Sequence, residues 1–279
     1  MTTSAAPPPT TSARPWLPAD WVFYLCLTIL GGSYVVLIVA MVVADLFYTS
    51  PGDVLAALND PKIRYSIKLS LISCTITAIL SLWVGVPMGY LLARTRFWGR
   101  GVVDTLLDIP IVLPPLVIGL SLLILFQTPP GRWFQDNIFR VTFWEPSVIL
   151  GQFAVAAAFA VRTMRITFEQ ISPRAEQVAM TLGCTRSQAF WRVVMPEARR
   201  GLMTAGTLAW ARALGEFGPI LIFSGATRYR TEVLSTTVWL EFGFSNLEAA
   251  IAVSLLMIAA AVVVLVLMRT LGLRGAGLV

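Results

Sequence analysis

Two opposite charges lie in an apolar stretch of the sequence, at a spacing that places them on one face of a helix. Arg212 and Glu216 are four residues apart and are the only charged residues in the run 202–223. Residues at i and i+4 are neighbours on a helix surface, and a charge at membrane depth is costly enough to indicate a function. An arginine there attracts anions, and its glutamate neighbour weakens that attraction, so we expect transient contact with an anionic ligand. The alternative is a self-neutralising pair that only stabilises a helix bundle.

A second group of polar residues, 169–200, forms a charged segment in an otherwise apolar chain. Its charged residues alternate with apolar ones at spacings of three and four, which is typical of amphipathic helices. We expect two short helices broken near Gly183, whose backbone permits a sharp turn. Such helices bind a partner surface or lie flat on the membrane. On the first helix, one small apolar face is predicted to consist of Ala175, Val178, Ala179 and Leu182.

The chain lacks the residue patterns on which most enzymes depend. It has no histidine, the commonest general base and metal ligand. Cys26, Cys74 and Cys184 are far apart and fit neither a disulfide framework nor a metal-binding spacing. No Gly-x-x-x-x-Gly-Lys-Ser/Thr phosphate loop occurs. We therefore expect no catalytic residue, no metal site and no cofactor on this chain.

The composition is that of an all-α membrane protein. Of 279 residues, 57% are hydrophobic and 13% are charged, a balance that a soluble domain of this size does not need. Six runs are expected to be transmembrane helices. They are residues 21–47, 65–93, 102–127, 147–162, 202–223 and 247–268. The fourth run is rich in alanine, which favours close helix packing.

Helix breakers mark the third and fifth of these runs. Pro114 and Pro115 lie in the third, and Gly215 and Gly218 lie beside Glu216 in the fifth. Breakers at membrane depth are tolerated where neighbouring helices or water satisfy the freed backbone. We expect these two helices to line a pathway, or the glycines to serve only as packing notches.

The basic residues predict the orientation. With the N-terminus inside, thirteen arginines fall in cytoplasmic segments and seven lysines and arginines outside. Both termini are therefore expected in the cytoplasm, together with the loop at about 166–200. Residues 1–18 are expected to be a disordered tail, 19–270 the membrane domain and 271–279 a short tail. The net charge of +6 follows this sidedness and accompanies no nucleic-acid motif.

The cytoplasmic loop carries a recognisable motif. Glu176-Gln177-Val178-Ala179 is followed by Gly183 and, thirteen residues later, by Pro196. This pattern resembles the permease subunits of binding-protein-dependent ABC importers, whose loop reads roughly Glu-Ala-Ala, three residues, Gly, nine residues, Ile-x-Leu-Pro. The chain departs from the pattern at Gln177, where the family usually has glutamate. Glu176, one place earlier, is a candidate to take over that role.

A narrower resemblance lies further along the chain. The string Ala-Arg-Ala-Leu-Gly-Glu-Phe-Gly at 211–218, Phe223-Ser224-Gly225 and Arg230-Thr231-Glu232-Val233-Leu234 look like the molybdate, tungstate and sulfate branch of these permeases. So does the stretch from Leu91 to Pro115. The likeness covers residues 65–268 and does not separate the three oxyanions.

The resemblance implies a type I permease fold, with six transmembrane helices and a cytoplasmic coupling helix between helices 4 and 5. It implies a pathway formed by two permeases, here a homodimer, with two ATPase subunits that bind ATP and magnesium, an extracytoplasmic substrate-binding protein and membrane lipid as partners. The residues expected to couple to the ATPase are Arg174, Ala175, Glu176, Gln177, Val178, Ala179, Leu182, Gly183 and Pro196. Those expected to line or gate the pathway are Arg212, Glu216, Gly215, Gly218, Pro114 and Pro115.

The outer loop 225–246 carries four further charges, Arg228, Arg230, Glu232 and Glu241. They are expected to be solvated or to meet the binding protein. The expected function is import of a tetrahedral oxyanion, molybdate or tungstate. The alternatives are a sulfate or thiosulfate permease, which more often pairs two different chains, a secondary transporter, and a membrane-embedded enzyme.

Overall fold

The computed structural model describes residues 21–274, and these are helical with short connections and no strand. The chain divides into two units, Met1–Tyr48 and Thr49–Val279. The first contains α1 (Trp21–Tyr48), a 28-residue helix without buried residues. The predicted disordered tail at 1–18 lies outside the described residues. Of the predicted tail at 271–279, the first four residues continue the last helix and the remainder is not described.

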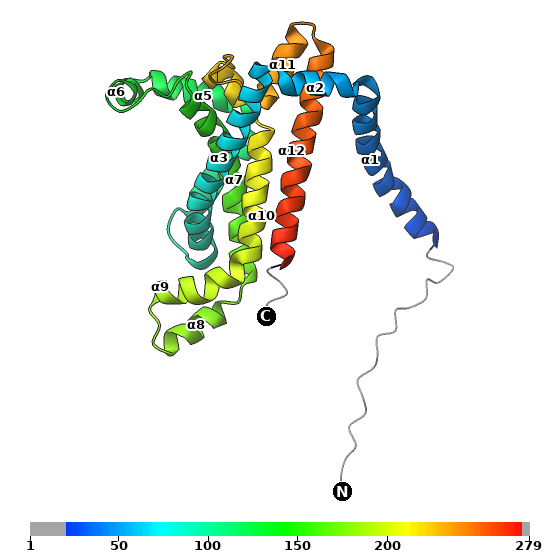
Figure 1. Ribbon diagram of the computed structural model, residues 1–279. Helices are drawn as coiled ribbons and strands as arrows, with labels where there is room; N and C mark the ends of the chain where they lie inside the picture. Colours follow the sequence, from blue (N-terminus) through cyan, green and yellow to red (C-terminus); the bar gives the residue numbers. More distant parts are fainter. Residues whose placement is uncertain (1–20, 275–279) are drawn as a thin grey trace. The chain divides into compact units, whose positions relative to one another are not determined.

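The second unit contains all the other helices (Figure 1). In chain order they are α2 (Pro51–Asn59), α3 (Pro61–Arg94), α4 (Arg100–Val112), α5 (Pro115–Gln127), α6 (Pro129–Asn137), α7 (Glu145–Gln170), α8 (Pro173–Thr181), α9 (Arg186–Ala189), the π-helical turn η1 (Phe190–Val194), α10 (Met195–Leu214), the π-helical turn η2 (Ile220–Ser224), α11 (Leu234–Gly243) and α12 (Leu247–Arg274). Within this unit, α8 and α9 lie at one end of the long helices, and α2, α6 and α11 lie at the other (Figure 1).

The core of the second unit is the contact between α3 and α7, against which α10 packs. Small residues make this contact close: a Cβ on Gly85 would lie 3.1 Å from Ala160, and one on Gly89 would lie 2.8 Å from the backbone nitrogen of Arg165. Ala156 and Ala160 of α7 are fully buried. The close packing predicted from the alanine-rich fourth run is therefore confirmed, and it holds the charged end of α7 beside α3.

Among the described residues, four helices are long and apolar enough to cross a membrane: α1, α3, α7 and α12. The third expected span is not one helix, because α4 and α5 meet at an angle of 113° and form either a broken span or a re-entrant loop. The break falls at Leu113 and Pro114. A proline lacks the N–H that a continuous helix needs, which accounts for its position.

The fifth expected span also departs from a single apolar helix. α10 is not among the four helices that are apolar enough to cross a membrane, because its first turns carry Glu197, Arg199 and Arg200. It ends at Leu214, and helical backbone resumes only at Gly218, directly before η2. The helices expected at 102–127 and 202–223 are therefore both interrupted, as their breakers indicated.

The α3–α7 contact leads to a stability prediction. We expect Gly89→Ala to lower the free energy of unfolding by about 1–3 kcal/mol, because the added methyl forces the backbones apart. Gly101→Ala in α4 is the matched control, since no atom lies within 4 Å of its added Cβ; there alanine should be neutral or slightly stabilising. Thermal unfolding of the protein in detergent measures both, and equal melting temperatures for the two variants would contradict the prediction.

Candidate functional site

One cavity brings together the residues that the sequence indicated for the pathway. It has a volume of about 360 Å³. Its lining contains all six predicted residues together with two that the sequence did not indicate: Pro114, Pro115, Leu116, Arg212, Gly215, Glu216, Phe217 and Gly218. The structure thus brings these residues together, while their role in a pathway remains a prediction.

The cavity forms where the two broken helices touch. A Cβ on Gly218 would lie 2.8 Å from the backbone nitrogen of Leu116, and one on Gly119 would lie 2.7 Å from the Cα of Pro219. Only glycine allows two backbones to approach so closely. Gly215 differs, because no atom lies nearer than 3.8 Å to its added Cβ. Gly218 and Gly119 are therefore contact points between the broken helices, and Gly215 leaves room in the cavity.

Arg212 and Glu216 form an ion pair at this cavity. The distance from Arg212 Nη1 to Glu216 Oε2 is 2.6 Å, and the side chains are 27% and 1% exposed. The guanidinium of Arg212 also lies 5.8 Å from the ring centroid of Phe159, within the range of a cation–π contact. Glutamate is thus enclosed and arginine is partly open. An anion that enters the cavity meets a positive group whose charge is partly compensated.

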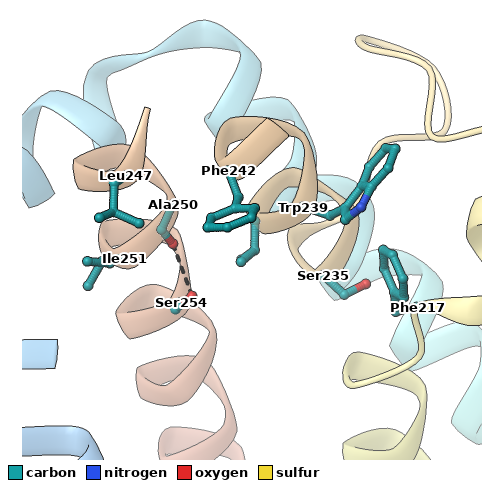
Figure 2. A pocket seen from close by; sticks show the side chains of 9 residues that line it. Phe217, Ser235, Trp239, Phe242, Leu247, Ala250, Ile251 and Ser254 are labelled. Atoms are coloured by element: carbon teal, nitrogen blue, oxygen red, sulfur yellow. Dashed lines mark hydrogen bonds between the residues drawn. The ribbon is translucent and has the colours of Figure 1, made fainter. Parts of the chain in front are cut away.

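A larger apolar pocket of about 420 Å³ lies next to this cavity, and Phe217 lines both. Figure 2 shows its lining, which comes mainly from α11 and α12, with Phe217 beside Ser235. The lining residues are Phe217, Ser235, Val238, Trp239, Phe242, Leu247, Ala250, Ile251 and Ser254. None of them is charged, so this pocket offers no group that compensates the desolvation of an anion.

The charged segment 169–200 contains the predicted turn at Gly183. Gly183 has a φ of +90°, and the N–H of Cys184 donates to the carbonyl of Ala179 while that of Gly183 donates to Met180, both at 3.1 Å. This pair of bonds ends α8 with a Schellman motif. The second short helix, however, is not separate: α9, η1 and α10 are continuous from Arg186 to Leu214. Pro196 lies in the first turn of α10.

The faces of α8 differ from the prediction. Val178 and Leu182 are exposed, the latter at 81%, and Arg174 and Gln177 are exposed beside them. Ala179 is buried and Ala175 is half-buried. The prediction that Ala179 shares one exposed apolar face with Val178 and Leu182 is therefore wrong, because Ala179 packs inward. We call the exposed set Arg174, Gln177, Val178 and Leu182 the coupling surface.

Glu176 also faces inward, with only 7% of its surface exposed. Its carboxylate accepts a hydrogen bond from the hydroxyl of Tyr90 and pairs with Arg94, both on α3. The family motif usually has glutamate at the position of Gln177, on the exposed side of α8. Because Glu176 faces inward, it does not take over that position.

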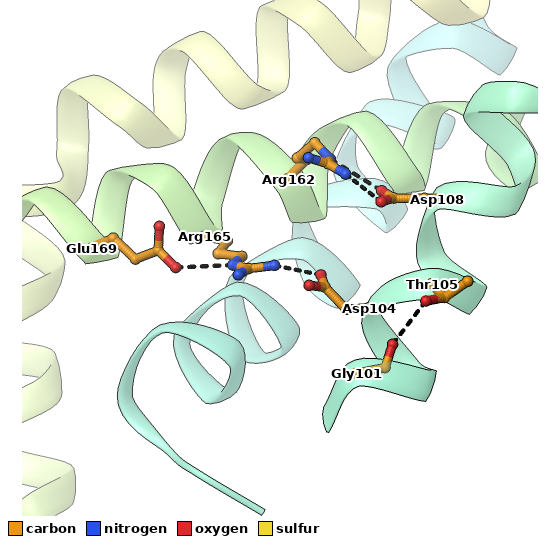
Figure 3. A network of polar contacts seen from close by, with 7 residues as sticks. All are labelled: Gly101, Asp104, Thr105, Asp108, Arg162, Arg165 and Glu169. Atoms are coloured by element: carbon orange, nitrogen blue, oxygen red, sulfur yellow. Dashed lines mark hydrogen bonds and ion pairs between the residues drawn. The ribbon is translucent and has the colours of Figure 1, made fainter. Parts of the chain in front are cut away.

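Two arginines that sequence reasoning used only for sidedness, Arg162 and Arg165, form a network with acidic residues between α4 and α7 (Figure 3). Arg162 pairs with Asp108, and Arg165 pairs with both Asp104 and Glu169. Asp104 and Asp108 are four residues apart, which was the available signal that they share a helix face. The network holds α4 to α7 on the approach to the break at Pro114.

The four charges of the loop 225–246 mostly meet each other or neighbouring rings. Arg228 Nη2 lies 2.8 Å from Glu241 Oε1, and the guanidinium of Arg230 lies 3.4 Å from the ring centroid of Trp144. Glu232 is fully buried, and burial raises the pKa of its carboxyl group above the usual value. The expectation that these residues are solvated is therefore wrong for Glu232 and Glu241, which are both buried.

Comparison with known proteins agrees with this architecture. Residues 85–274 match the family described as binding-protein-dependent transport system inner membrane component. The sulfate transport system permease protein CysT of Escherichia coli K12 is 30% identical over 90% of this chain and 89% of its own length. The molybdate/tungstate transport system permease protein WtpB of Thermococcus kodakarensis is 29% identical over 90% and 96%.

Solved structures show the same fold. A chain of the bacterial alginate ABC transporter superposes with a TM-score of 0.75 at 16% identity, covering 92% of this chain and 95% of the other. A chain of the MetNI methionine ABC transporter gives 0.62 at 16% identity and covers 78% and 99%. The chain therefore belongs to the binding-protein-dependent transport system inner membrane components, as a multi-pass permease subunit of an ABC importer, in the branch of the sulfate and molybdate/tungstate permeases, whose ATPase is a separate subunit.

Proposed function

We propose that this chain forms the transmembrane pathway for a tetrahedral oxyanion. The observation that carries the proposal is the Arg212–Glu216 pair in a cavity of about 360 Å³ between two broken helices. A planar guanidinium donates paired hydrogen bonds to oxyanions. Arg212 is the one cationic residue in the cavity lining.

The compensation by Glu216 suits transport rather than storage. A pathway must bind its cargo strongly enough for entry and weakly enough for release. An arginine without a partner in a low-dielectric cavity would hold a dianion tightly. The buried carboxylate of Glu216 reduces that attraction, and Arg212 keeps some of its surface open.

We assign molybdate or tungstate as the cargo, with sulfate or thiosulfate as the alternative. Relatives named for sulfate and for molybdate/tungstate match this chain at 30% and 29% identity. A single arginine recognises the charge and shape that these dianions share. Discrimination among them is therefore assigned to the substrate-binding protein.

The assembly we propose contains two copies of this chain, two ATPase subunits and an extracytoplasmic binding protein. ATP and magnesium bind to the ATPase subunits, which dock on the coupling surface. The end of the second unit that carries α8 and α9 faces the cytoplasm, as do both termini. Support for this orientation comes from the excess of arginines in the segments at that end.

The cargo is tested on the cognate binding protein by calorimetry with molybdate, tungstate and sulfate. We expect molybdate and tungstate to bind at least about tenfold more tightly than sulfate, a difference of about 1.4 kcal/mol. Tighter binding of sulfate would favour the alternative cargo.

The pathway role of the ion pair is tested with Arg212→Met, Glu216→Leu and the double variant. Arg212→Met leaves Glu216 buried without its partner and should lower the free energy of unfolding by about 3–5 kcal/mol. Glu216→Leu should lower the free energy of unfolding by less, because the side chain of Arg212 is 27% exposed and water can reach its charge. The double variant should recover stability but not oxyanion uptake into cells. Uptake at the wild-type rate by the double variant would show that the pair only stabilises the bundle.

The coupling role of α8 is tested with Gly183→Ala. Its control is Gly99→Ala, because both glycines have a φ near +90° and no atom within 4 Å of an added Cβ. Each substitution should cost about 1 kcal/mol of backbone strain. Only Gly183→Ala should weaken copurification of the ATPase, since it displaces Leu182 at the end of the coupling surface. Equal ATPase recovery with both variants would refute this assignment.

A further inference from the structure

Glu176 connects α8 to α3 through polar contacts. The hydroxyl of Tyr90 donates to Glu176 Oε1 at 2.5 Å, and Arg94 Nε lies 3.7 Å from Glu176 Oε2. Both partners are on the last turns of α3, more than 80 residues earlier in the chain. Because Glu176 lies in the first turn of α8, these contacts fix the start of the helix.

Arg94 holds the preceding residues as well. Its Nη2 donates to the carbonyl oxygen of Ile171 at 2.7 Å. Ile171 is the C-cap of α7, so one guanidinium contacts both sides of the connection between α7 and α8. The side chains of Arg94 and Glu176 are only 11% and 9% exposed. An ion pair with so little access to water is screened less than an exposed ion pair.

Tyr90 contacts the segments on both sides of α8. Its ring lies edge-on to Phe168 of α7 at 5.5 Å and to Phe190 of η1 at 4.8 Å between centroids. The three rings belong to a cluster that includes the buried residues Met164 and Val194. The ring is therefore fixed by packing, and its hydroxyl is held in position for Glu176.

Without this contact, α8 would be attached mainly through its two connections. Its outer residues Arg174, Gln177, Val178 and Leu182 are exposed, and inward packing comes from the small Ala179 and the half-buried Ala175 and Met180. A helix of nine residues held by so little apolar surface opens easily on its own. The contact with α3 supplies the missing attachment.

We propose that Tyr90 and Arg94 are positioning residues that clamp α8 to α3 through Glu176, so that a displacement of α8 is passed to α3 as well as to α10. The role of the clamp in coupling rests on the proposed function. The clamp itself is a property of this chain alone and is measurable without the ATPase.

The clamp is tested first on the purified permease by limited trypsin digestion. Arg174 is exposed at the start of α8, so the rate of cleavage after Arg174, followed by mass spectrometry, reports how often α8 opens. We expect Tyr90→Phe and Glu176→Gln to raise this rate about tenfold, because each removes or weakens a hydrogen bond to a charged group. Unchanged cleavage in both variants overturns the proposal.

Tyr65→Phe is the matched control. Tyr65 lies on the opposite end of α3, and its hydroxyl donates to the carbonyl of Arg230 at 3.4 Å. The substitution is the same and removes the polar contacts of a hydroxyl on the same helix, here with Arg230 and Glu145, but it should leave cleavage after Arg174 at the wild-type rate. Faster cleavage with Tyr65→Phe would mean that general loosening of α3, and not the clamp, exposes α8, and would overturn the proposal.

The second measurement uses the complete transporter in proteoliposomes, with its ATPase and binding protein. Tyr90→Phe and Glu176→Gln should each raise the ATP hydrolysed per oxyanion imported at least about threefold, as expected for the loss of one such hydrogen bond, with unchanged recovery of the ATPase. The double variant should be no worse than Glu176→Gln. A wild-type ratio in both single variants overturns the positioning role. Absence of oxyanion transport by the wild-type complex contradicts the proposed function instead and leaves the cleavage result standing.

Discussion

Backbone that leaves the helical path at membrane depth frees N–H and C=O groups, and lipid cannot satisfy them. This constraint explains why the two interrupted helices of the chain lie against each other. The break between α4 and α5 falls at Leu113 and Pro114, and the break after α10 spans residues 215–217. Gly119 and Gly218 bring the two segments into backbone contact. Each break thus has the other segment on one side, while Leu113, Pro114 and Gly215 remain exposed, and the cavity with Arg212 and Glu216 forms at their junction.

Local signals in the sequence predicted this junction well. Prolines and glycines often interrupt helices, and the breakers at 114–115 and 215–218 indicated which helices would be interrupted, although Pro87 and Pro110 lie within continuous helices. The charges at 212 and 216 indicated where polar groups would need cover. The sequence did not reveal the 113° bend between α4 and α5, because a bend depends on which surface each half packs against. Nor did the sequence show that α9 would continue into α10, because the π-helical turn between them has no distinctive amino-acid composition.

Contacts between residues far apart in the chain could not be predicted in the same way. The inward orientation of Glu176 depends on Tyr90 and Arg94, and the position of α4 depends on ion pairs of Asp104 and Asp108 with α7. Arg94, Arg162 and Arg165 were predicted to be cytoplasmic because basic residues are more numerous in the segments on that side. A count of this kind treats every arginine alike. In the structure each of them has an acidic partner. The same residues can therefore satisfy the topology rule and hold the helices together.

The course of α10 connects the two regions to which function is assigned. Its 20 residues span about 30 Å, and it begins in the segment that follows α8 and ends at the cavity. Arg212 belongs to its last turn, whereas Glu216 lies beyond Gly215, in the segment that Gly218 holds against α5. The N–H of Glu216 donates to the carbonyl of Ala213 in α10, whereas the carbonyl of Glu216 accepts from the hydroxyl of Ser235 in α11. Glu216 is therefore tied to both helices. Under the proposed function, a displacement of α10 relative to α11 acts on the ion pair, and with it on the charge that the cavity presents to an anion.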